Sequence, residues 1–127
     1  MRMGAAWYLK EEAMAKTIRL DIPGVRVNET GHRVLSYIAD CARKANRGLA
    51  CEPVAISRRN FCRELGISET GAIRTCHALE ACGLMVCTSR TMEDGGQIAN
   101  RYHLTALGLE VLRLCDVAVA EGRVGVS

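Results

Sequence analysis

The sequence has 127 residues, which fits one folded domain and leaves little room for a second. Its net charge of +3 permits a nucleic-acid partner but is not basic enough to argue for one alone. No apolar run approaches the roughly 20 residues of a membrane span, and no signal peptide with a cleavage site is visible, so we expect a cytoplasmic protein.

The N-terminal part is predicted to form a short helix over residues 1–16, with untidy apolar spacing, followed by extended chain. Ile18, Leu20 and Ile22 alternate with polar residues, as in a strand. The pair Pro23–Gly24 then signals a turn.

A clearer helix follows. Either Asn28 or Thr30 can cap it. Apolar residues repeat with helical spacing over 34–45, and Gly48 supplies a stop. The next run, CEPVAIS, is predicted to be a short strand, and Pro53 within it argues for the edge of a sheet.

The stretch SRRNFCRELGISETGAIRTCHALEACGLM predicts two short helices around a tight turn. Ser57 can cap the first helix, Arg58–Leu65, and Ser68 can cap the second, residues 69–82. Gly66 between them can take a positive φ angle without a steric cost.

The second of these helices carries two different faces. Ala72, Cys76 and Leu79 have the spacing of core residues. The predicted exposed arc holds Glu69, Thr70, Gly71, Ile73, Arg74 and His77. A helix that only buried its apolar face would not need this second set, so the pattern predicts a contact surface.

After the second helix the apolar period changes to that of strands. Residues 84–91 and 98–104 favour two strands joined by the polar turn MEDGGQ, which together make a β-hairpin. Thr105 can cap a last helix, and residues 121–127 are expected to form a frayed tail.

The order helix, strand, helix, turn, helix, hairpin, over about residues 30–115, resembles the winged helix-turn-helix family. LGIS and ALEACGLM resemble its recognition unit and the start of its wing. GGQIANRYHLTALGLEVL resembles its second wing strand and closing helix, as in MarR-type regulators and phage or plasmid helix-turn-helix proteins. The resemblance implies a mainly α fold with a small β-hairpin. We expect residues 1–27 to form an arm that can serve dimerisation, residues 28–120 the winged-helix domain, and residues 121–127 the tail.

The resemblance also implies that the helix 69–82 enters the major groove of double-stranded DNA. Arg74 could then donate two hydrogen bonds to guanine, Ile73 could meet a thymine methyl group, and Gly71 could let the backbone approach closely. The predicted DNA-binding residues at this helix are Ser68, Thr70, Gly71, Ile73, Arg74 and His77, of which His77 is interpreted more readily as a partly exposed helix residue than as a base reader.

Phosphate contacts are expected on both sides of this helix. Arg58 and Arg59 lie at the start of the preceding helix. On the hairpin, the expected contacts are Arg90, Gln97, Asn100 and Arg101. Glu93 and Asp94 at the tip repel phosphate, so deep insertion of the tip into the minor groove is not expected. Each residue also has a purely structural interpretation, as a solvated charge or a helix cap.

The predicted function is sequence-specific binding of double-stranded DNA by a transcriptional regulator. We expect a homodimer because one module reads only a few base pairs, and residues 1–27 and 105–120 are the candidate dimer surfaces. Two alternatives remain: a DNA-binding component of a plasmid or phage replication or partition complex, and a winged helix that binds protein.

Seven cysteines are spread along the chain: Cys41, Cys51, Cys62, Cys76, Cys82, Cys87 and Cys115. Their number is odd and none makes a C-x-x-C pair, so we interpret most as small buried hydrophobes in a reducing compartment. A metal or redox sensor built from Cys76, His77, Cys82 and Cys87 is a further alternative. Cys76 and His77 are adjacent on a helix and point in different directions, so they cannot form a nucleophile–base pair with each other. No phosphate-binding Gly-rich motif and no paired carboxylates stand out, and we expect no enzyme, cofactor or metal.

Overall fold

The computed structural model describes residues 16–91 and 97–125. The helix predicted over 1–16 lies outside the described residues except at Lys16, and so do Glu93 and Asp94. The elements run in the order β1 (Thr17–Ile18), β2 (Val27–Asn28), α2 (Glu29–Ala45), β3 (Val54–Ile56), α3 (Arg58–Leu65), α4 (Glu69–Ala81), β4 (Met85–Thr91), β5 (Gln97–Leu104), α5 (Ala106–Ala120) and β6 (Val124–Gly125).

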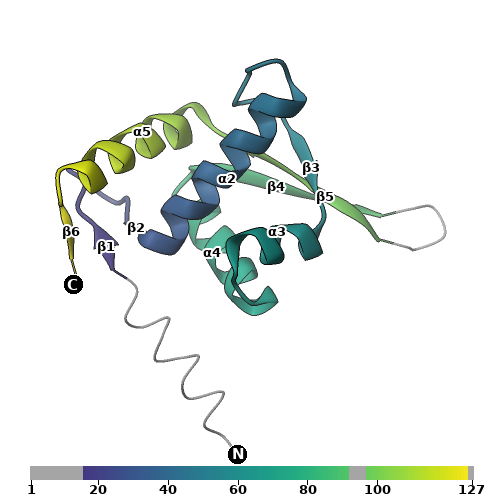
Figure 1. Cartoon of the computed structure of the whole chain (residues 1–127), viewed down its shortest axis with the longest axis horizontal. Coiled ribbons are helices and arrows are strands. Elements are labelled where there is room, and N and C mark those ends of the chain that lie inside the picture. The colour runs from purple at the N-terminus through teal and green to yellow at the C-terminus, as the bar shows by residue number, and fades with distance from the viewer. Residues whose placement is uncertain (1–15, 92–96, 126–127) are drawn as a thin grey trace, which may run out of the picture.

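Two small antiparallel sheets lie at opposite sides of the molecule (Figure 1). One has the order β2-β1-β6 and lies beside α5. The other has the order β3-β5-β4, and its β4–β5 hairpin projects away from the helices. Strand β3 is therefore at a sheet edge, as Pro53 predicted.

Helix α2 runs through the middle of the fold and supplies much of the core. The Asn28 side chain accepts a hydrogen bond from the Gly31 N–H over 2.7 Å, which confirms Asn28 as the cap. Val34, Leu35 and Ile38 are fully buried. The helix thus forms a scaffold on which the other helices and the second sheet pack.

Helices α3 and α4 form the predicted helix-turn-helix. The Ser57 hydroxyl accepts from the Asn60 N–H over 3.1 Å, and the Ser68 hydroxyl accepts from the Gly71 N–H over 3.0 Å. Gly66 between the helices has a φ angle of +65°, in the left-handed region where glycine has no Cβ penalty. Both caps and the turn confirm the predictions from sequence.

The second sheet covers this unit through aromatic contacts. Phe61 of α3 stacks on Tyr102 of β5 with 5.2 Å between ring centroids, and meets Tyr37 of α2 edge-on at 5.8 Å. Three elements that are distant in sequence therefore meet at one ring, which fixes the hairpin relative to the helix pair.

The C-terminal residues differ from the prediction. Val124 and Gly125 form β6, which pairs with Ile18 and Thr17 of β1, so the expectation of a frayed tail is wrong there. The strand predicted across Ile18, Leu20 and Ile22 is limited to two residues because the chain after Ile18 turns toward β2. Within the described part of the chain, no helix combines the length and apolarity needed to cross a membrane.

Candidate nucleic-acid interface

Helix α4 has a buried side and an exposed side, as the sequence predicted. Ala72, Cys76 and Leu79 are 5%, 8% and 2% exposed and belong to the core. Of the predicted exposed arc, Glu69, Thr70, Ile73, Arg74 and His77 are exposed. Among them is Ile73, a large apolar residue that keeps 39% of its surface exposed to solvent and is not part of the core.

Gly71 is an exception to the predicted arc, because it is buried. Gly71, Thr75 and Leu79 are spaced four residues apart, so they share one side of the helix, and that side faces the core. The expectation that Gly71 lies on the exposed surface, where its backbone would approach DNA, is therefore wrong. Its N–H is also taken by the Ser68 cap.

The start of α3 lies beside the start of α4. Nη1 of Arg58, the first residue of α3, lies 2.9 Å from Oε1 of Glu69, the first residue of α4. Both side chains are exposed, with 39% and 63% of their surface accessible. Arg59 is exposed next to them. The predicted phosphate-binding arginines therefore lie on the same side as the N-terminus of α4.

Arg33 of α2 was not among the predicted residues. Its guanidinium donates to the carbonyl oxygen of Leu65, the last residue of α3. A cation at a helix C-terminus is favoured by the helix dipole. Arg33 therefore ties the helix pair to α2, a contact between residues too far apart in sequence for a local pattern to reveal.

Asn100 and Arg101, both predicted to contact phosphate, have side chains on opposite sides of the second sheet. Asn100 is only 8% exposed, and its Nδ2 donates to the Tyr102 hydroxyl over 3.3 Å. The expected phosphate contact by Asn100 is therefore wrong, because alternate residues of a strand face opposite sides. Arg101 is exposed on the other side of the sheet, opposite Ala55 of β3.

Arg90 and Gln97 lie on the paired wing strands, where Arg90 is opposite Ile98 and Gln97 is opposite Thr91. This register puts both near the loop end of the hairpin, beyond a bulge between Thr88 and Arg90. Their phosphate contacts stay predictions.

Two cysteines and a tyrosine with raised pKa values lie on the core side of α4 and on the wing strands. Burial raises the pKa of Cys76 to about 12 and the pKa of Tyr102 to about 12. Burial, with Glu80 nearby, also raises the pKa of Cys87. These thiols are therefore neutral near pH 7, which disfavours the thiolate that metal binding or nucleophilic attack requires.

The residues of the sensor alternative are also dispersed. Cys76 is buried in the core, whereas the adjacent His77 is exposed to solvent. Cys82 directs its sulfur toward the carbonyl oxygen of Gly24, 3.9 Å away. In the described ranges, no group of three or more His, Cys, Asp or Glu side chains is arranged to hold a metal ion.

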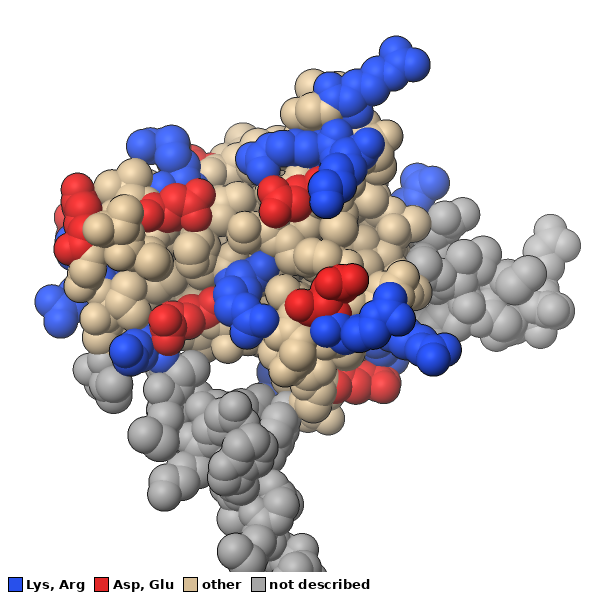
Figure 2. All heavy atoms as spheres, viewed as in Figure 1, with Lys and Arg blue, Asp and Glu red and all other residues tan. Residues whose placement is uncertain are grey.

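Charge is mixed on the surface that includes α3 and α4. Figure 2 shows basic and acidic side chains interspersed on this face, without a large area of one sign. A general attraction for polyanions is therefore modest, in line with the net charge of +3. An interface here depends on individual side chains.

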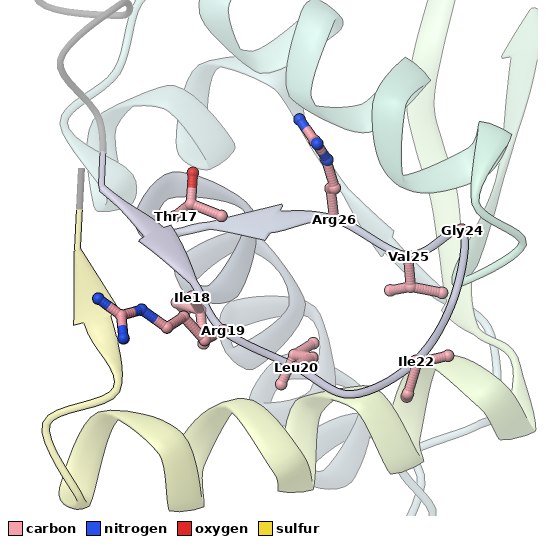
Figure 3. A pocket seen from close by; sticks show the side chains of 8 residues that line it. All are labelled: Thr17, Ile18, Arg19, Leu20, Ile22, Gly24, Val25 and Arg26. Atoms are coloured by element: carbon pink, nitrogen blue, oxygen red, sulfur yellow. The ribbon is translucent and has the colours of Figure 1, made fainter. Parts of the chain in front are cut away.

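A separate hollow of about 460 Å³ lies in the loop between β1 and β2 (Figure 3). Leu20, Ile22 and Val25 give it an apolar lining, and Arg19 and Arg26 extend in different directions. Its lining includes no Asp, Glu, His or Cys, so it offers no acid–base or metal chemistry.

Comparison with solved structures identifies the architecture. The transcriptional regulator PcaV from Streptomyces coelicolor, solved with its natural ligand, matches with a TM-score of 0.52 and 19% identity, over 94% of this chain and 69% of that one. ZitR from Lactococcus lactis, a zinc-responsive MarR family member, matches with a TM-score of 0.53 and 14% identity, over 94% and 72% of the two chains. A ZitR variant in complex with DNA gives a TM-score of 0.55 at 13% identity, over 94% and 70%.

These likenesses confirm the predicted fold class, a winged helix-turn-helix like that of MarR-family regulators. No family model matches the sequence, and comparison with curated proteins gives no match.

Proposed function

We propose that this protein binds double-stranded DNA sequence-specifically and acts as a transcriptional regulator. The observation that carries the proposal is the exposed side of α4, where Thr70, Ile73, Arg74 and His77 project from a helix whose other side is buried. The likeness of the fold to transcriptional regulators supports it.

In this proposal α4 lies in the major groove, which is wide enough for a helix. Arg74 donates two hydrogen bonds to O6 and N7 of a guanine, and Ile73 contacts a thymine methyl group. Thr70, near the N-terminus of α4, contacts a base or a phosphate oxygen. His77 is one turn beyond Ile73 and Arg74 on the same exposed side and reaches the groove floor or a sugar.

The helix α3 supplies contacts to the phosphates. Arg58 and Arg59 are its first two residues, next to backbone N–H groups that attract anions. The wing provides a second set of contacts, for which Arg90, Gln97 and Arg101 are the candidates. These contacts set the position of α4 and give the binding its salt dependence.

We further propose that two copies bind together, because one module reads few base pairs and a two-fold dimer reads a palindrome. Helix α5 carries the exposed apolar residues Leu107, Val117 and Val119 and stays the candidate dimer surface.

Selection of bound duplexes from a random library, followed by footprinting of the selected sites, tests the proposal. A short palindrome is the expected result. An array of repeats would instead favour a replication or partition role. Failure of the protein to enrich any sequence, together with equal binding by wild type and Arg74→Ala, would overturn the proposal.

A further inference from the structure

The structure joins the two helices of the helix-turn-helix through one exposed ion pair. Arg58 and Glu69 are the first residues of α3 and α4, and the pair joins their side chains over 2.9 Å. Exposed pairs contribute little to folding, typically about 0–1 kcal/mol. The ion pair itself therefore adds little to folding, although it places a carboxylate where a DNA phosphate backbone would approach.

Glu69 is on the surface that the proposed function uses. Glu69 and Ile73 are four residues apart, so their side chains are neighbours on α4. One helical turn rises about 5.4 Å and successive base pairs are about 3.4 Å apart. When Ile73 contacts one base pair, Glu69 therefore lies one or two base pairs away along the groove.

The pair leaves both groups with unused bonding capacity. The hydrogen bond between them takes one N–H of Arg58 and one oxygen of Glu69. A guanidinium has five N–H donors, and a carboxylate has about four acceptor positions. Arg58 can therefore donate to a phosphate while it still holds Glu69. In the major groove, the exposed amino group that suits a carboxylate is N4 of cytosine.

We infer that Arg58 and Glu69 act as one specificity unit, in which Arg58 binds a phosphate and holds the Glu69 carboxylate to accept a hydrogen bond from cytosine N4. This inference rests on the proposed function and adds a base to the site that it reads. Glu69 reads the base, and Arg58 is a positioning residue that couples the backbone contact to that reading. At guanine or thymine the carboxylate finds no donor, and at adenine the N7 acceptor beside the N6 amino group repels it, so these sequences are selected against.

Substitution of Glu69 by glutamine tests the inference. Glutamine presents a donor and an acceptor together, the pattern that pairs with adenine N6 and N7. In a library selection, Glu69→Gln should lose its preference for cytosine at one base pair by roughly tenfold, with adenine gaining there. Preferences at the other base pairs should stay as in wild type. The matched control is Glu29→Gln, which also removes an exposed carboxylate from the first residue of a helix, here α2.

Arg58→Ala tests the coupling between the two residues. It should weaken binding to all duplexes and also reduce discrimination at the base pair that Glu69 reads. The double variant should discriminate there no worse than Glu69→Gln alone, because the two substitutions remove the same interaction. Thermal unfolding of each variant checks that the folded state is retained.

Two results would overturn the inference. One is a Glu69→Gln protein that keeps every base preference of wild type. The other is a uniform gain in affinity for all sequences, which would make Glu69 a repulsive group only. If the wild-type protein prefers no sequence, the proposed function fails together with the inference. If the protein keeps its preference at the base pair read by Arg74 but Glu69→Gln changes nothing, only the inference fails.

Discussion

The backbone of Gly108 lies directly against the carbonyl oxygen of Leu84. An ideal Cβ built on Gly108 would be 1.8 Å from that oxygen, far inside any permitted contact. The same oxygen accepts a hydrogen bond from the Thr105 N–H over 3.0 Å, and the Thr105 hydroxyl donates to the Gly83 carbonyl over 2.7 Å. The start of α5 is therefore seated on the segment that links α4 to the wing.

Gly108→Ala should destabilise the fold by about 3 kcal/mol or more, because the clash is with backbone that cannot move alone. Gly31→Ala is the matched control within a helix. There the nearest atom to a Cβ is a Val27 side-chain carbon at 3.3 Å. A gain in helix propensity of up to about 1 kcal/mol offsets that close contact. Chemical denaturation measures both, and equal effects would show that α5 is not seated on Leu84.

Leu79→Ala should cost about 2–5 kcal/mol of unfolding free energy, because Leu79 is 2% exposed and its removal leaves a cavity. Ile73→Ala on the opposite side of α4 should cost about 0.5 kcal/mol or less but should lower DNA affinity. Denaturation and DNA binding measured on both variants check the orientation of α4. A reversed order of stability losses would contradict it.

Substitution of Arg74 and substitution of Arg59 should weaken DNA binding in different ways. Arg74→Ala should cost about 1–3 kcal/mol on the preferred site and relax discrimination at one base pair, because a bidentate contact to guanine is lost. Arg59→Ala should weaken binding to all sequences alike and reduce the slope of log affinity against log salt by about 1.

A salt series with preferred and scrambled duplexes measures both quantities for each variant. If Arg74→Ala keeps its discrimination and only lowers the salt slope, then Arg74 contacts a phosphate rather than a base.

The fold should lose stability in alkali through its buried thiols. Burial raises the pKa of Cys76 from 9.0 to about 12, so the folded state keeps a proton that the unfolded chain releases. This contribution is fully present below pH 9 and is lost as the pH rises toward 12. At pH 10 the loss should be about 1 kcal/mol.

Cys76→Ala should flatten the alkaline fall in unfolding free energy. Cys115→Ala should flatten it less, because burial raises the pKa of Cys115 only to about 11. Denaturation curves between pH 8 and pH 11 measure these slopes. Unchanged slopes in both variants would assign the alkaline loss to other groups, such as Tyr102.

The boundaries of the helices were predictable because their signals are local. Ser57, Ser68 and Thr105 each accept a hydrogen bond from an N–H three residues later, as their positions before apolar runs indicated. Gly66 likewise adopts the left-handed conformation that its place between two helices predicted. The core side of α4 followed from helical spacing alone.

The faces and pairings that depend on distant residues were not predictable. Gly71 has no side chain whose polarity marks its side of α4, so the apolar pattern did not assign it to the core, where the packed helix places it. Asn100 and Arg101 are both polar neighbours, so their opposite orientations depend on the register of β5 against β3 and β4.

The sequence by itself therefore determined where α3, α4 and α5 begin and, apart from Gly71, what the exposed side of α4 carries, because caps and helical periods act over a few residues. Tertiary structure alone decided that Arg58 meets Glu69, that Arg33 holds the end of α3, and that β6 completes a sheet with β1. Each of these contacts joins separate elements of the fold, and its geometry is fixed only when the core has packed.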